Sequence, residues 1–393
     1  MAWWAAGAAC LAAAGCAGAG VAQAQPAGTT VAGALAPVGS ATTASAASAC
    51  VTRTLDGMTL AQRVGQLFLV GISGDIAGPQ FTAAERTYHF GSLLLTETSV
   101  GTARLAAQTA AMQALAPTDT NGARLFIAAN QEGGEVQQLT GPGFDTMPSE
   151  VTQGGWSTSA LRTAATTWGT ELHAAGVNLD LAPVMDVVPA GTAASNAPVG
   201  QLDREFGSDP ATNGAHGAAF IQGMADAGVM SVAKHFPGLG RVAGNTDFTA
   251  NVVDNVTTPD DPDLGSFKAA VAAGVPMVMV ALATYTKIDP AQLAVFSPAV
   301  LKLLRGEMGF SGVIMSDDLG EAVAVQSVAP GSRAIRFLTA GGDLITSQTL
   351  EPAEQMAAAV LAEAQGSAAF EGTVNAAARQ VLTAKQAAGL LPC

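Results

Sequence analysis

The sequence has little charge, few aromatic residues and few basic side chains. Charged residues make up 12% and aromatic residues 5% of the 393 residues, whereas an ordinary soluble domain carries roughly 25% charge. The 17 lysines and arginines are outnumbered by 31 aspartates and glutamates, which gives a net charge of −14. Nucleic-acid binding needs clustered lysine and arginine, so we expect no nucleic-acid partner.

Cysteine is also scarce. The four cysteines are too few and too scattered for a zinc ribbon or a small disulfide-dense domain. Cysteines and histidines show no spacing typical of metal ligands, so we expect no metal site and no cofactor. Hydrophobic residues reach 49%, and the 45 glycines and 19 prolines fall short of a low-complexity composition. An ordered, loop-rich globular protein is therefore expected.

The first 24 residues are interpreted as a signal peptide. They are uncharged and apolar, and Ala-Gln-Ala at residues 22–24 fits a small-x-small cleavage site, so we place the cut after Ala24. The alternative is a lipoprotein signal in which Cys16, after Ala14 and Gly15, carries the lipid. No later apolar run is long enough to span a bilayer. We expect a secreted protein, or one anchored at the cell surface through Cys16.

The two ends of the mature chain carry an expected linker, residues 25–50, and the two remaining cysteines. Residues 25–50 are rich in alanine, threonine, serine and glycine without a hydrophobic period, which predicts a flexible linker before a domain at 51–393. In an oxidising compartment Cys50 and Cys393 are expected to form a disulfide, for which the entropic model gives about 4–5 kcal/mol at most. The alternative is two free terminal thiols.

Eight short apolar runs recur along the body of the chain, separated by stretches with helical spacing. Continuous apolar runs are typical of parallel strands that are buried on both faces. Eight strand–helix units in about 340 residues predict a (β/α)8 barrel. A doubly wound open sheet is the alternative, but no glycine-rich phosphate loop follows the first run. The runs are Gln66–Gly71, Ser92–Leu95, Leu125–Asn130, Val177–Asp186, Val229–His235, Val275–Ala281, Gly312–Asp317 and Asp343–Thr346.

Polar residues stand at the ends of several of these runs. In a barrel, the carboxyl ends of the strands form the active-site face. A charged residue directly after a buried strand is costly unless it is paired or faces a cleft, so we expect these residues to converge on a site. The alternative is a ring of structural ion pairs and helix caps. The residues are Asn130-Gln131-Glu132, Asp186, Lys234-His235 and Asp317-Asp318.

Five motifs in this region follow one another in a recognisable order. They are NQEGG at 130–134, APVMDV at 182–187, REFGSDP at 204–210, KHFPGLG at 234–240 and SDDL at 316–319. Together they resemble the motifs of glycoside hydrolase family 3, and in particular its β-N-acetylhexosaminidase branch. The likeness covers roughly residues 59–390 and is closest to the members that are single barrels without a C-terminal sandwich domain.

The resemblance implies retaining hydrolysis of a β-linked amino sugar, as in peptidoglycan fragments, through a covalent glycosyl-enzyme. Asp317 takes the place of the nucleophile, although a helix cap is the alternative for this residue. Arg204, Lys234 and His235 take the places of residues that hold sugar hydroxyls, and Asp186 belongs to the same expected binding site. For His235 the alternative is a hydrogen-bonded core histidine.

The chain departs from the family at its general acid/base. The family uses an Asp-Ser-His triplet, and counting from Lys234 places Asn245, Thr246 and Asp247 there. In one interpretation Asp247 is the acid/base, at ~5–5.5 Å from Asp317 and with a raised pKa, which pairing with Arg241 would oppose. In the other, the barrel is catalytically weak or only binds a glycan. An ordinary polar loop residue is also possible.

A second departure lies in the sugar-binding positions. Asn130 replaces the family's aspartate, and Gln138 replaces an arginine, so one charge of each sign disappears together. Such a paired loss is compatible with a working pocket of altered selectivity. The few aromatic residues, with Trp156 and Trp168 the only tryptophans of the mature chain, favour a small pocket over a long polysaccharide groove. A two-lobed solute-binding protein was the remaining alternative, and the eight-unit pattern argues against it.

Overall fold

The computed structural model describes residues 38–72 and 78–393. The expected signal peptide, Cys16 and the first part of the expected linker lie outside the described residues. Within the described range no helix has both the length and the apolar character needed to cross a membrane.

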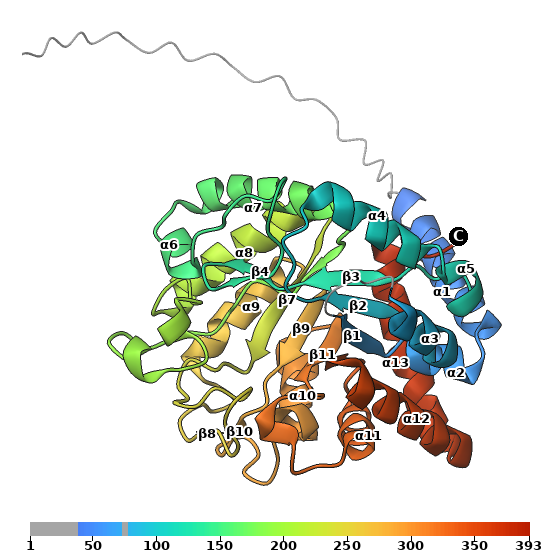
Figure 1. Cartoon of the computed structure of the whole chain (residues 1–393). Helices are drawn as coiled ribbons and strands as arrows, with labels where there is room; N and C mark the ends of the chain where they lie inside the picture. Colours follow the sequence, from blue (N-terminus) through green and yellow to red (C-terminus); the bar gives the residue numbers. More distant parts are fainter. Residues whose placement is uncertain (1–37, 73–77) are drawn as a thin grey trace, which may run out of the picture. The chain divides into compact units, whose positions relative to one another are not determined.

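Eight parallel strands of the described chain form a closed barrel (Figure 1). Around the barrel, the strands follow one another in the order β1-β12-β11-β9-β7-β6-β3-β2. Each of the eight predicted runs overlaps one barrel strand, so the predicted (β/α)8 barrel is confirmed and the open sheet is wrong. The strands are β1 (Phe68–Ile72), β2 (Ser92–Leu95), β3 (Phe126–Ala129), β6 (Leu179–Asp180), β7 (Met230–Phe236), β9 (Met277–Val280), β11 (Val313–Asp318) and β12 (Leu344–Ser347).

Burial on both faces explains why these runs become strands. Every residue of β2, β3 and β9 is buried, one face against the barrel interior and the other against the surrounding helices. Two small sheets accompany the barrel: β4 (Gln131–Gly133) pairs with β5 (Val136–Gln137), and β8 (Val253–Asp254) pairs with β10 (Thr284–Tyr285).

The helices begin at conventional signals. The Ser157 side chain accepts the Ala160 N–H at the start of α7, and Asp209 caps α8 just before a proline. The remaining bounds are α2 (Leu60–Gly65), α3 (Pro79–Tyr88), α4 (Thr102–Gln113), α5 (Ala116–Asp119), α6 (Glu150–Gly154), α7 (Thr158–Ala174), α8 (Pro210–Asp226), α9 (Gly265–Ala272), α10 (Pro298–Lys302), α11 (Pro330–Ala340), α12 (Leu350–Gly366) and α13 (Ala368–Ala387).

The first helix corrects one expectation and the disulfide confirms another. Helix α1 spans Val38–Gly57, so residues 38–50 of the expected flexible linker are helical. Cys50, on this helix, is bonded to Cys393, with their Cα atoms 5.8 Å apart. The predicted disulfide is therefore confirmed, and the alternative of two free thiols is wrong.

The C-terminal helix α13 closes the amino end of the barrel. Its Lys385 is fully buried, and Nζ donates to the Gln66 side-chain oxygen at 2.6 Å and to the Gly91 carbonyl at 2.7 Å. Gln66 and Gly91 lie just before β1 and β2, so this end is filled by the protein itself. The opposite end, where the strands finish, is the one that holds the cavity described next.

Candidate active site

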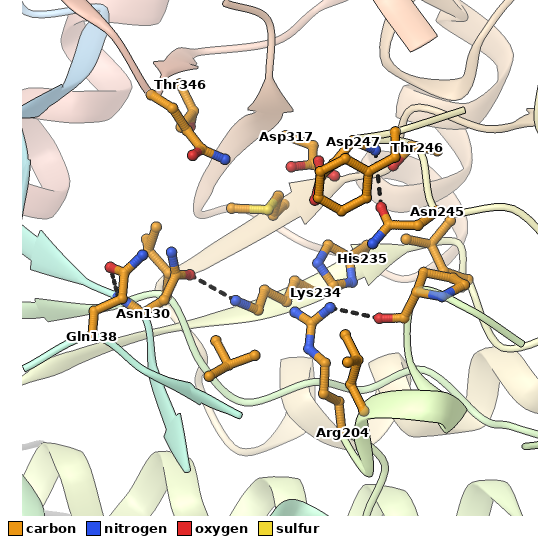
Figure 2. Close-up of a pocket in the computed structure, with 18 of the residues that line it drawn as sticks. Asn130, Gln138, Arg204, Lys234, His235, Asn245, Thr246, Asp247, Asp317 and Thr346 are labelled. Atoms are coloured by element: carbon orange, nitrogen blue, oxygen red, sulfur yellow. Dashed lines mark hydrogen bonds between the residues drawn. The ribbon is translucent and has the colours of Figure 1, made fainter. Parts of the chain in front are cut away.

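A cavity of about 250 Å³ lies at the carboxyl ends of the barrel strands (Figure 2). Seven of the eight residues predicted for catalysis or sugar binding line it. Neither Trp156 nor Trp168 does, and the remaining lining is mainly small polar and aliphatic. The seven residues are Asn130, Gln138, Arg204, Lys234, His235, Asp247 and Asp317.

Asp317 is the second-last residue of β11, and its carboxylate is partly exposed to the cavity. The neighbouring Asp318 points the other way and is buried. Its carboxylate accepts backbone N–H groups of Gly320 and Glu321, at 2.9 Å each, and of Gln348 at 2.9 Å. Asp318 therefore satisfies the donors of the following segment, and the helix-cap alternative for Asp317 is wrong.

Asp247 lies in a turn of the loop after β7. The Asn245 side-chain oxygen accepts the Asp247 N–H at 2.9 Å, and the Asn245 carbonyl accepts the Phe248 N–H at 3.1 Å. Burial and the charge of Asp317 raise the pKa of Asp247. His235, Arg204 and Lys234 act in the opposite direction. The carboxyl group is thus in surroundings that favour its protonated form.

Two backbone hydrogen bonds join this turn to the loop that follows Asp317. The Val323 N–H donates to the Asp247 carbonyl and the Ala324 N–H donates to the Thr246 carbonyl, both at 3.1 Å. The segments that carry the two candidate catalytic carboxyls are therefore connected directly through the main chain.

Arg241 does not pair with Asp247. Its guanidinium contacts Asp261 and Asp263, each at 2.6 Å, and holds the loop after β7 against the segment before α9. The expected conflict between Arg241 and a protonated Asp247 therefore does not arise.

Glu132 organises the cations of the site, a role that the sequence did not assign to it. It is fully buried, and Arg204 contacts both its carboxylate oxygens, at 2.7 and 2.8 Å, while Lys234 Nζ lies 2.5 Å away. Burial alone would raise the pKa of Glu132, but the charges of Arg204 and Lys234 outweigh it and lower the pKa to about 2. The ionised carboxylate fixes both cations before any substrate binds. The sequence places Glu132 at a strand end and within the NQEGG motif, but neither signal indicates this role.

Two further carboxyl groups lie buried near Glu132. Burial and the negative charge of Glu132 raise the pKa of Glu150 well above its usual value, and burial likewise raises that of Asp180. Each accepts one backbone N–H: Glu150 from Val184 at 3.1 Å and Asp180 from Gln131 at 3.0 Å. The raised pKa of each group favours its neutral form, whereas the lowered pKa of Glu132 keeps a negative charge beneath the two cations.

Asp186 requires a correction, because it does not line the cavity. It is fully buried and accepts hydrogen bonds from the backbone N–H groups of His235 and Leu239, both at 3.0 Å. It also accepts a hydrogen bond from the ring Nδ1 of His235 at 2.8 Å. Asp186 is therefore a positioning residue behind His235, with no access to a sugar. The core-histidine alternative for His235 does not hold, because the ring lines the cavity.

Asn130 and Gln138 form a neutral pair on the cavity wall. Lys234 Nζ donates to the Asn130 side-chain oxygen at 2.9 Å, and the Gln138 side-chain oxygen accepts the Asn130 N–H at 3.1 Å (Figure 2). The side-chain oxygens of Asn130 and Gln138 are both engaged in this way. No group of three or more histidine, cysteine or acidic side chains within the described residues is arranged to hold a metal ion.

Comparison with known proteins identifies the family. The model of the glycosyl hydrolase family 3 N-terminal domain matches residues 59–384. The chain belongs to this family. The resemblance inferred from the five motifs is confirmed. As a member of this family, the barrel is an O-glycosyl hydrolase. A two-lobed solute-binding protein is excluded by the closed barrel.

The family 3 barrel is similar to several known proteins. It is 30% identical over 330 residues to a β-hexosaminidase of Stenotrophomonas maltophilia, covering 79% of this chain and 91% of the relative. The crystal structure of a β-N-acetylhexosaminidase from Beutenbergia cavernae is 45% identical, with a TM-score of 0.81 and coverage of 84% and 98%. Mycobacterium tuberculosis LpqI is 29% identical, with a TM-score of 0.71 and coverage of 84% and 94%.

Proposed function

We propose that this barrel is a retaining hydrolase of β-N-acetylglucosaminides, such as peptidoglycan fragments, and that it acts through a covalent glycosyl–Asp317 intermediate. The observation that carries the proposal is that Asp317 and Asp247 line one cavity with three donors, Arg204, Lys234 and His235, which buried carboxylates hold in place. The names of the similar proteins, β-hexosaminidase and β-N-acetylhexosaminidase, support the choice of sugar.

The reaction takes two steps. An Asp317 oxygen attacks the anomeric carbon, and the bond to the leaving-group oxygen breaks as that oxygen takes the proton of Asp247. Water then attacks the same carbon, Asp247 accepts a proton from the water, and the bond to Asp317 breaks. Both steps invert the anomeric centre, so the configuration is retained overall.

Two replacements in the same turn fit each other chemically: Asp247 stands in place of the family's histidine and Asn245 in place of its aspartate. A histidine acid needs a carboxylate partner to fix its tautomer. A carboxylic acid does not need that partner, because it has no tautomer to fix. Asn245 is neutral and accepts the Asp247 N–H, so it shapes the turn and adds no charge. Burial and Asp317 then supply the raised pKa that an acid catalyst requires.

The first sugar is bound by groups that are already oriented. Glu132 holds Arg204 and Lys234, and Asp186 holds His235, so these donors lose little freedom when a sugar binds. The cavity volume, about 250 Å³, lies below the roughly 300–1,000 Å³ of ordinary ligand sites and suits one sugar ring better than a polymer.

Trapping with a 5-fluoro-N-acetylglucosaminyl fluoride, followed by peptide mapping, tests the proposal. We expect one label per chain, on Asp317, and none on the Asp317→Asn variant. The competing function is a barrel that only binds glycans. No turnover of aryl β-N-acetylglucosaminides or β-glucosides, together with retained glycan binding, would favour that binder and contradict the hydrolase.

Export is part of the proposal. The disulfide between Cys50 and Cys393 supports an oxidising compartment, where such bonds persist. Mapping the N-terminus of the mature protein should give Gln25 if the cut follows Ala24. Detection of a lipid on Cys16, lost in Cys16→Ser, would replace free secretion by a surface anchor.

A further inference from the structure

Phe248 is an uncovered aromatic ring at the rim of the cavity. It lines the cavity, yet 80% of its surface is exposed, whereas the other exposed large hydrophobic residues of the described chain are valines at 40–53%. Aromatic residues make up only 5% of this chain. A phenylalanine left in water beside the catalytic carboxyls therefore calls for a partner that the protein itself does not provide.

The position of Phe248 is fixed relative to the acid/base. It directly follows Asp247, and its N–H donates to the Asn245 carbonyl at 3.1 Å. The same turn is anchored by the hydrogen bonds from Val323 and Ala324 described above. These bonds hold the backbone at Phe248, which keeps the ring at the mouth of the cavity next to Asp247.

The side of the substrate that reaches this ring follows from the chemistry. The acid/base protonates the glycosidic oxygen, so Asp247 stands on the leaving-group side of the bond that breaks. The sugar that joins Asp317 is bound, in the proposed function, by Arg204, Lys234 and His235, whose side chains are largely buried, whereas Phe248 is exposed at the rim. A ring next to Asp247 at the mouth of the cavity thus meets the leaving group.

We propose that Phe248 forms a leaving-group subsite, on which a pyranose ring packs its C–H face, and that it favours saccharides over small alcohols as leaving groups. This inference rests on the proposed function. Burial of roughly 55 Å² of apolar surface corresponds to about a tenfold effect on binding.

Reactivation of the trapped enzyme tests the subsite separately from the first sugar. In buffer, water releases the sugar from Asp317. With added N,N′-diacetylchitobiose, an acceptor hydroxyl attacks the anomeric carbon, Asp247 takes its proton and the bond to Asp317 breaks. For Phe248→Ala we expect the half-saturating acceptor concentration to rise about tenfold, while reactivation in buffer stays unchanged. Phe248→Trp should retain acceptor binding, and Val256→Ala, at an exposed residue outside the cavity, should match the wild type.

A steady-state comparison gives an independent readout. Phe248→Ala should lower kcat/KM about tenfold for the disaccharide and leave it unchanged for methyl β-N-acetylglucosaminide. The inference would be overturned if Phe248→Ala and the wild type had equal half-saturating acceptor concentrations. It would also be overturned if kcat/KM fell equally on both substrates, because the ring would then lie against the first sugar. Absence of label on Asp317 would instead overturn the proposed function, and the two failures are thereby distinguished.

Discussion

The buried carboxylate of Asp186 accepts hydrogen bonds from both the backbone N–H and the ring Nδ1 of His235, at 3.0 and 2.8 Å. Because Nδ1 is occupied, Nε2 is the ring nitrogen available to a sugar in the cavity. The orientation of His235 is therefore set by a residue that never touches the substrate.

Replacing Asp186 by asparagine should lower kcat/KM about 10–100-fold. An amide has one acceptor oxygen for three donors, and its NH2 group would face another N–H, so charge-assisted bonds are lost and the ring is released. We expect the change mainly in KM, since His235 binds sugar, with labelling of Asp317 still complete. An unchanged KM for Asp186→Asn would show that the ring keeps its place without the carboxylate.

Removing the acid/base should cost most where the leaving group is poor. For Asp247→Asn we expect kcat/KM to fall about 10²–10⁴-fold on a disaccharide, but far less on a 2,4-dinitrophenyl glycoside, whose leaving group needs no proton. Added azide should restore turnover of the latter and give a β-glycosyl azide. Equal losses on both substrates, without azide rescue, would mean that another group transfers the proton.

The pH profile should carry an alkaline limb that belongs to Asp247. Burial and the Asp317 charge raise the pKa of Asp247, and an acid catalyst must be protonated, so kcat/KM falls as the pH rises through that raised pKa. In Asp247→Asn this limb should disappear on the activated substrate. If the limb persisted there, it would have to be assigned to a different residue.

Glu132→Gln should destabilise the fold by about 3–5 kcal/mol, because Arg204 and Lys234 would be left buried without their counter-charge. The folded-state pKa of Glu132 is about 2, below its ordinary 4.5, so its contribution is present above pH 4.5 and is lost as the pH falls toward 2. Chemical unfolding between pH 2 and 4.5 should show that the free energy of unfolding depends less on pH in Glu132→Gln than in the wild type.

Asp226→Asn is the matched control for that experiment. It also removes the carboxylate of an arginine pair, but Arg162 and Asp226 are exposed, at 49% and 43%. Little change is expected, since solvent screens such a pair. If both variants lost a comparable free energy of unfolding, burial would not be what makes the ion pairs of Glu132 stabilising.

Replacing both Cys50 and Cys393 by serine should lower the free energy of unfolding by about 2–5 kcal/mol. The bond closes almost the entire barrel chain, since the two cysteines are 343 positions apart in the sequence, and so restricts the unfolded state. Activity at low temperature should be retained, because both cysteines lie away from the cavity. Urea unfolding with and without a reductant provides the measurement, and equal midpoints would contradict the expectation.

The barrel was predictable because burial on both faces leaves a direct trace in the sequence, as in β2 and β9. The helix α1 was not, since its alanine, serine and threonine residues show no hydrophobic period. Its last turns are held by tertiary contacts of Cys50, Val51 and Leu55, which only the folded chain reveals.

The candidate site was predictable to the level of strand ends and no further. Where a strand finishes, the chain turns, and which of two neighbouring residues faces the cavity depends on that turn. Glu132, in β4, turns beneath the cations, and Asp186 turns behind His235. Phe248 lies in a loop, where neither periodicity nor charge marks a residue as functional.

The bond between Cys50 and Cys393 turns the barrel chain into a covalent ring. A single proteolytic cut in any surface loop between them would open the ring without releasing a fragment. Nicked enzyme would therefore migrate as one species on a non-reducing gel and as two after reduction, and its two pieces would remain tethered for reassembly around the catalytic centre.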